Sequence, residues 1–155
     1  VFEALPGELG RLISVGRLDF NSEGLLLLTN DGALARRLEL PTTGWTRRYR
    51  ARVHGTVDPG ALARLAQGVT IAGIRYGAIE ATLDRVQGSN AWLTLALKEG
   101  KNREVRRVME YLGLRVTRLI RLAYGPFQLG NLPSGAVAEV PSRVLRDQLG
   151  SSAPS

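Results

Sequence analysis

The chain has 155 residues, of which 44% are hydrophobic, enough for the core of one ordinary domain, and no stretch approaches the roughly 20 apolar residues that span a bilayer. It contains no cysteine, which excludes disulfides and thiolate chemistry, and its one histidine argues against a zinc centre or a serine–histidine relay. The formal net charge of +7 at pH 7 favours a polyanionic partner.

Hydrophobic periodicity and turn residues predict a strand-rich chain with about four short helices. In chain order, strands are expected at 12–16, 25–29 and 48–57, within 74–86, and at 91–98, 116–123 and 136–140. Helices are expected at 33–38, 59–67, 103–112 and 142–149, with Asp31, Asp58, Asn102 and Ser142 as their capping residues. The connections between the strands are short, and residues 87–90 form a typical hairpin turn.

This order of elements predicts an α+β fold with a mixed, mainly antiparallel sheet and flanking helices, and it argues against a doubly wound nucleotide-binding fold. The sequence contains no internal repeat and no linker, so we expect one domain. Residues 150–155 are expected to form a disordered tail.

The first candidate site is the glycine-bounded segment 16–32, which lies between two apolar strands. It contains Asp19, with Arg17 two residues before it. Catalytic groups are often carried by loops whose flanks are rigid. The alternative is a surface turn in which the Asp19 carboxylate accepts hydrogen bonds from backbone amides. The residues alone leave both interpretations open and favour the turn.

The second candidate site is the start of the predicted helix 103–112. Basic side chains gather there, and the partial positive charge of a helix N-terminus adds to them, which favours phosphate binding. We expect three arginines of this helix to lie together on a side away from its apolar stripe. The alternative is a solvated basic face without a ligand. The basic residues are Lys98, Lys101, Arg103, Arg106 and Arg107.

Two further segments are candidates. In residues 47–52, Tyr49 lies among four arginines. This arrangement favours binding of a nucleic acid, with a base stacked on the tyrosine ring and the backbone phosphates neutralised by the arginines. The alternative is that Tyr49 fills the core face of its strand. Residues 118–126 are predicted to form a strand followed by a tight turn, for which core packing is the simplest interpretation.

These four segments, in this order, resemble one group of bacterial ribosomal pseudouridine synthases, which comprises enzyme A for the small ribosomal subunit and enzymes B, E and F for the large one. The block at 15–32 is similar to the signature around the catalytic aspartate of that group, and the likeness continues to about residue 140. Segments 99–107 and 118–125 are most similar to the enzymes of type B. The resemblance implies the catalytic fold of pseudouridine synthases.

The resemblance also implies a function. We expect an RNA pseudouridine synthase that isomerises a uridine of large-subunit ribosomal RNA as a cytoplasmic monomer, without a metal or a cofactor. The alternatives are a small-subunit ribosomal RNA pseudouridine synthase and a non-catalytic RNA-binding or ribosome-assembly module.

By resemblance, Asp19 matches the essential aspartate, which acts either as a nucleophile at the sugar or as a base that promotes a glycal intermediate. Tyr49 matches the tyrosine that packs on the target base, and Arg106 matches the basic partner of the aspartate. Leu119, or its neighbour Ile120, matches the apolar residue of the base pocket. The residues expected to contact RNA are Arg17, Lys101, Arg103, Arg107 and Arg121.

The same resemblance predicts that the chain lacks the first catalytic strand of the group and the small S4-like RNA-binding domain that precedes it. We therefore expect residues 1–149 to form a catalytic domain that is incomplete at its N-terminus. The target uridine is expected to depend largely on that missing domain and on the shape of the RNA.

Overall fold

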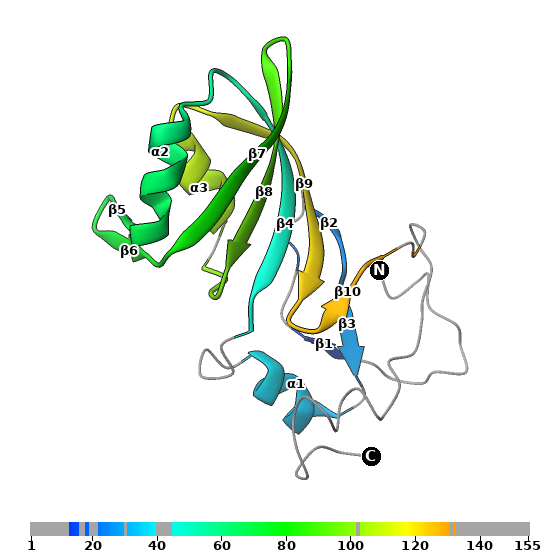
Figure 1. Cartoon of the computed structure of the whole chain (residues 1–155). Helices are drawn as coiled ribbons and strands as arrows, with labels where there is room; N and C mark the ends of the chain where they lie inside the picture. Colours follow the sequence, from blue (N-terminus) through cyan, green and yellow to red (C-terminus); the bar gives the residue numbers. More distant parts are fainter. Residues whose placement is uncertain are drawn as a thin grey trace.

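A computed structural model describes residues 13–15, 18, 22–29, 31–39, 45–101, 103–130 and 132 (Figure 1). The helices are α1 (Gly32–Glu39), α2 (Pro59–Arg64), the 3-10 helix η4 (Leu65–Gln67) and α3 (Glu104–Tyr111). The strands are β1 (Ile13–Val15), β2 (Glu23–Gly24), β3 (Leu27–Thr29), β4 (Arg47–His54), β5 (Val69–Ile71), β6 (Ile74–Tyr76), β7 (Ile79–Gln87), β8 (Asn90–Leu97), β9 (Arg115–Tyr124) and β10 (Phe127–Gln128). None of the helices in these ranges has the length and apolar character of a membrane span.

The long strands form one sheet in the order β10-β9-β4-β8-β7. The neighbouring strands in this order pair antiparallel, and β2 adds a short parallel pairing to β9. The central strand is β4, which pairs along its length with β8 on one side and with β9 on the other. These pairings confirm the predicted α+β class with a mixed, mainly antiparallel sheet.

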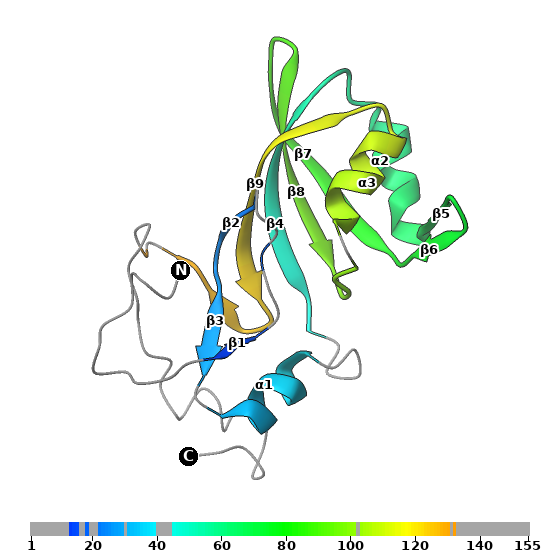
Figure 2. The same cartoon turned by 180° about the vertical axis from the view of Figure 1, so that it is seen from behind.

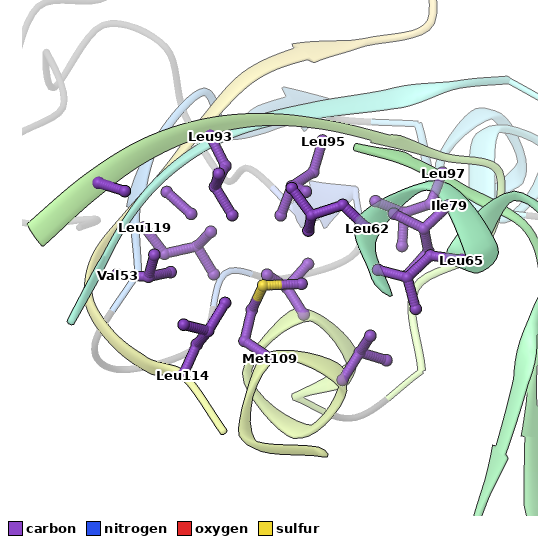
Figure 3. Packing of buried hydrophobic residues seen from close by; sticks show 14 of the residues in the cluster. Val53, Leu62, Leu65, Ile79, Leu93, Leu95, Leu97, Met109, Leu114 and Leu119 are labelled. Atoms are coloured by element: carbon purple, nitrogen blue, oxygen red, sulfur yellow. The ribbon is translucent and has the colours of Figure 1, made fainter. Parts of the chain in front are cut away.

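Helices α2 and α3 pack against the same face of this sheet, which we call the helix-covered face (Figures 1 and 2). In β4 the residues on this face are Ala51 and Val53, and both are fully buried. Figure 3 shows Met109 extending from α3 toward sheet residues that include Val53 and Leu119. Complete burial of such side chains is worth about 2 kcal/mol each, so packing on this face stabilises the sheet.

A second cluster of buried residues lies where α1 packs on the β1–β3 pair. It includes Val15 of β1, Leu27 of β3 and the aromatic residues Tyr124 and Phe127 at the end of the sheet. Trp45 packs edge-on against both of these rings, at centroid distances of 6.4 and 5.6 Å. The second cluster therefore fixes the strands on either side of the segment that contains Asp19.

Two predicted helix caps are confirmed. The side chain of Asp31 accepts hydrogen bonds from the backbone N–H groups of Ala33 and Leu34 at the start of α1. The side chain of Asp58 accepts one from Gly60, with proline at the first position of α2.

At α3 the start of the helix differs from the prediction. Arg103 adopts a left-handed conformation with φ 51°, so the helix begins at Glu104 instead of Arg103. The predicted cap Asn102 lies outside the described residues, as do the predicted strand 136–140, the predicted helix 142–149 and the tail 150–155.

The strand predicted within residues 74–86 is β7, which begins at Ile79. Residues 74–76 do not belong to the long strand that precedes the turn at 87–90; they form β6, which pairs with β5 in a separate hairpin. Ala72 and Gly73, both with positive φ, make the tight turn of this hairpin. The sequence pattern missed β5 because three residues are too few to show an alternation.

Candidate active site

Tyr49 lies on the helix-covered face of β4, where the alternation of the strand also places the buried Ala51 and Val53. Its side chain is half-buried and packs against the main hydrophobic cluster. Across the strand pairs, Tyr49 is opposite Leu95 of β8 and Arg121 of β9. The ring is therefore held by the core at one end of this face while part of it remains accessible.

Leu119 lies on the same face of the neighbouring strand β9. It pairs with Ala51 of β4 and is 4% exposed. Ile120, the other candidate for the apolar pocket residue, pairs with Arg50, whose side chain is exposed on the opposite face. The register thus places Leu119, and not Ile120, on the Tyr49 side of the sheet.

Arg106 is buried, with 8% of its surface exposed, and it lies on α3 among the buried residues Val105 and Met109. Because α3 packs on β9, the guanidinium group belongs to the same side of the sheet as Leu119. The expectation that Arg103, Arg106 and Arg107 share one side of the helix is wrong, since the other two arginines are exposed.

Asp19 and Arg17 lie outside the described residues, but the strands that precede and follow this segment are described. Before them, Val15 is 1% exposed and pairs with Leu27 of β3. After them, β2 runs parallel to β9, with Gly24 opposite Arg121. The chain therefore returns from this segment beside the part of β9 whose other neighbour is Tyr49.

Arg121 fixes the chain where it leaves β2. Its backbone C=O accepts a hydrogen bond from the N–H of Leu25, and its Nε donates to the C=O of Leu25, both at 2.9 Å. Arg121 is 3% exposed, and its guanidinium carbon lies 5.3 Å from the ring centroid of Tyr124. Within the described part of the chain its Nη2 has no acceptor. This burial does not support the RNA contact expected of Arg121, because RNA would reach only exposed groups; the sequence showed its charge but not its place in the sheet.

Gly24 has φ 108°, and a Cβ atom at this position would lie 2.2 Å from the C=O oxygen of Arg121. We expect Gly24→Ala to separate β2 from β9 and to lower the free energy of unfolding by roughly 2 kcal/mol or more. Urea denaturation measures this loss. Gly73→Ala is the matched control, because Gly73 also has positive φ but faces open space. It should cost only about 1 kcal/mol; equal losses in the two variants would contradict the clash.

Lys101, an expected RNA contact, is exposed but already engaged by the protein. Its Nζ donates to Oε2 of Glu99 and to the C=O of Arg75, both at 2.6 Å. The hydrogen bond to Glu99 raises the pKa of the Lys101 ammonium group. Glu99 also accepts a hydrogen bond from the N–H of Gly77. These contacts join the strand end before α3 to the β6–β7 connection, so Lys101 orders the approach to α3.

Glu104, the first residue of α3, is 3% exposed. Burial raises the pKa of its carboxyl to about 7. The hydrogen bond from the Lys101 N–H lowers this pKa, and the negative charge of Glu99 raises it. For Glu99, burial alone would raise the pKa, but the hydrogen bonds from Lys101 and Gly77 lower it below its usual value. Of the two carboxyls, Glu104 is therefore the one that holds a proton near neutral pH.

This pKa predicts how stability depends on pH. Only the folded state keeps the Glu104 proton between pH 4.5 and about 7, so its contribution to stability is lost as pH rises through that window. We expect Glu104→Gln, which mimics the protonated form, to exceed the wild type in free energy of unfolding by roughly 1 to 3 kcal/mol at pH 8 and by little at pH 4.5. Urea denaturation at both values measures this difference. Glu110→Gln, which changes an exposed carboxyl of the same helix, is the control and should show no such trend.

Among the described residues, no group of three or more histidine, aspartate or glutamate side chains could hold a metal ion. What the structure brings together on one side of the sheet is an accessible tyrosine ring, a buried leucine and a buried arginine. Such a set can pack against a planar ring and hold an anion near it.

The chain is similar in sequence and in structure to known proteins. The sequence model of the RNA pseudouridylate synthase family matches residues 4–111. The chain is 48% identical over 145 residues to an "Uncharacterized RNA pseudouridine synthase" of Rickettsia felis, covering 94% of this chain and 62% of the relative. It is 46% identical over 142 residues to "Ribosomal large subunit pseudouridine synthase B" of Haemophilus influenzae, covering 90% and 40%.

The chain therefore spans about three fifths and two fifths of the lengths of these two relatives. Among solved structures, a pseudouridylate synthase crystal structure superimposes with a TM-score of 0.81 at 26% identity, over 95% of this chain and 64% of the other. The match confirms the predicted catalytic fold. The chain belongs to the RNA pseudouridylate synthase family.

Proposed function

We propose that this protein isomerises a uridine of large-subunit ribosomal RNA to pseudouridine. One observation carries the proposal: Tyr49 and Leu119 share a face of two paired strands, and the helix that packs on that face contributes the buried cation Arg106. The relatives named ribosomal large subunit pseudouridine synthase B, at 43 to 46% identity, support this substrate.

The reaction breaks the N1–C1′ glycosidic bond of uridine, turns the uracil and joins C5 to C1′. N1 gains a proton and C5 loses one, so atoms and charge balance without a change of oxidation state. No group is imported, and the proposed reaction therefore requires neither a cofactor nor a metal.

In this proposal Asp19 either attacks C1′ or removes a proton to give a glycal, and both roles need an ionised carboxylate. Removal of water from this carboxylate would disfavour its charged form, and the cation of Arg106 would oppose that effect. The exposed part of the Tyr49 ring offers a surface for the uracil. Leu119 keeps water from the reacting bond.

The target nucleotide must leave its stack, which costs a few kcal/mol. We propose that Arg17, Lys101, Arg103 and Arg107 offset part of this cost through RNA contacts; the last three are exposed. Residues 1–149 would form the catalytic domain, acting as a monomer in the cytoplasm.

The test follows the hydrogen at C5. Large-subunit and small-subunit ribosomal RNA transcripts carrying tritium at C5 of uridine are incubated with the protein, and tritium in the water is counted. Release from the large-subunit RNA is expected, because C5 loses its hydrogen when it bonds to C1′. Release from small-subunit RNA alone would show that the substrate is small-subunit and not large-subunit ribosomal RNA. Binding to RNA without release from either would identify a non-catalytic module and overturn the proposal.

A further inference from the structure

The pleat of β4 divides residues 47–52 between the two faces of the sheet. Tyr49 lies on the helix-covered face, whereas Arg48, Arg50 and Arg52 belong to the opposite face, which we call the outer face. The structure therefore does not place these three arginines around a base that packs on Tyr49. Any ligand that these arginines bind must therefore lie on the outer face.

An aromatic ring lies among these arginines. Trp92 of β8 pairs with Arg52, and the guanidinium of Arg50 lies 4.6 Å from the centroid of its ring, with that of Arg52 at 5.9 Å. Arg118 of β9 also pairs with Arg52 and forms an exposed ion pair with Glu23 at 2.7 Å. A guanidinium that stacks on a ring keeps its N–H groups at its edge, where they remain available for phosphate oxygens.

The arginines are poorly compensated by the protein itself. Within the described residues, the guanidinium groups of Arg48 and Arg50, both exposed, have no hydrogen-bond acceptor and no ion pair. Arg52 and Arg118 are directly opposite each other, and the ion pair with Glu23 offsets the charge of Arg118 but not that of Arg52. A bound polyanion would neutralise the remaining positive charge.

A purely structural explanation accounts for only part of this surface. Arg50 and Arg52 both lie over the Trp92 ring, and the Nε of Arg52 donates a hydrogen bond to Oγ1 of Thr117 at 2.9 Å, so structural contacts account for these two arginines but not for Arg48. The acidic residues Glu80 and Asp84 belong to β7 at the edge of the sheet, and Asp84 accepts a hydrogen bond from Thr94. The positive charge of this face therefore follows β4, with Arg118 of β9 opposite Arg52 and Arg85 of β7 opposite Trp92.

We propose that the outer face is a second RNA-binding surface, which takes the backbone of a ribosomal RNA segment away from the target uridine. Alternate residues of a strand repeat about every 6.7 Å, comparable to successive phosphates of an extended RNA strand. Arg48, Arg50 and Arg52 thus form a ladder of phosphate sites, and Trp92 offers a ring beside it on which a base can stack. The choice of RNA as occupant rests on the proposed function.

The test measures affinity for a large-subunit ribosomal RNA fragment over a range of salt concentrations. The double variant Arg48→Gln/Arg50→Gln removes two charges that make no hydrogen bond within the described part of the protein, so its fold should persist, which circular dichroism checks. We expect the dissociation constant to rise on the order of tenfold and the slope of log K against log salt to fall in magnitude by about 1.5. Arg36→Gln/Arg64→Gln removes two exposed charges from α1 and α2 and should leave the slope unchanged.

If the double variant keeps the wild-type slope and binds within twofold of the wild type, the second surface is overturned, whatever the tritium assay shows. If Arg48→Gln/Arg50→Gln reduces the salt dependence of binding but the wild type releases no tritium, the second RNA-binding surface is supported and the proposed isomerase activity is overturned. A wild-type protein that does not bind the RNA at all would overturn both. Equal losses in the outer-face and control variants would indicate net charge alone and also contradict a defined surface.

Discussion

Replacing Asp19 with alanine is expected to abolish tritium release from uridine-labelled ribosomal RNA while RNA binding survives. In either proposed role, the carboxylate is the group that starts the reaction at the sugar, and alanine removes it. Binding should persist because most of the affinity comes from contacts between basic side chains and phosphates. A loss of about four orders of magnitude or more in single-turnover rate is the expected scale for a nucleophile or its base.

Asp19→Asn keeps the size of the side chain and removes its charge, so it should be equally inactive. Glu23→Gln is the control, since Glu23 is a carboxylate a few residues away whose exposed ion pair with Arg118 is worth little. It should retain turnover. Substantial turnover by Asp19→Ala would overturn the assignment of the catalytic aspartate, even if the wild type proves to be a pseudouridine synthase.

Arg106→Ala is expected to lower the turnover rate by roughly 10²-fold or more, with a much smaller effect on RNA affinity. The guanidinium group is buried on the side of the sheet that carries Tyr49 and Leu119, so its charge acts in a low dielectric environment on groups close to it. Steady-state and single-turnover rates at saturating RNA separate this effect from a binding defect.

Arg107 provides the contrast, because it is the next residue of the same helix but is exposed. Arg107→Ala should weaken binding and reduce its salt dependence by about one counterion, with turnover at saturating RNA less affected than in Arg106→Ala. The unfolding free energies of both variants must be measured, because removal of a buried charge also alters stability. Equal losses of affinity in the two variants would identify Arg106 as a phosphate contact.

The sequence alone predicts that alternate residues of β4 lie on opposite faces of the sheet. A period of two places Tyr49 opposite in direction to Arg48 and Arg50 whatever the strand packs against. The pattern could not say which face the helices cover, nor that Trp92 lies beside the arginines. Those facts depend on the pairing of β4 with β8, which brings together residues about forty positions apart.

The arginines of α3 show a similar limit. With about 100° between successive residues, Arg107 lies opposite the apolar stripe of Val105 and Met109, and its exposure follows from the helix alone. Arg106 lies at the margin of the stripe, where burial is decided by the strand that the helix contacts. Sequence periodicity therefore predicted the helix but not the burial of its central cation.

The contacts of Arg121 could not be predicted from the sequence. Its charge suggested a contact with RNA, and nothing in the pattern of β9 shows that its side chain closes on the carbonyl of Leu25. A two-residue parallel pairing such as β2 with β9 has no periodicity to detect. The contacts that hold the return from Asp19 were thus invisible until the strands were placed.

The pleat of β4 also separates two kinds of change that one strand can accept. Odd-numbered positions from 49 to 53 belong to the helix-covered face, whereas even-numbered positions from 48 to 52 belong to the outer face. A substitution at an even position changes the charge outside the core without altering the packing under α3. Variants of this strand can therefore be made in which each side is redesigned independently, whereas insertion of a single residue within it would exchange the two sides.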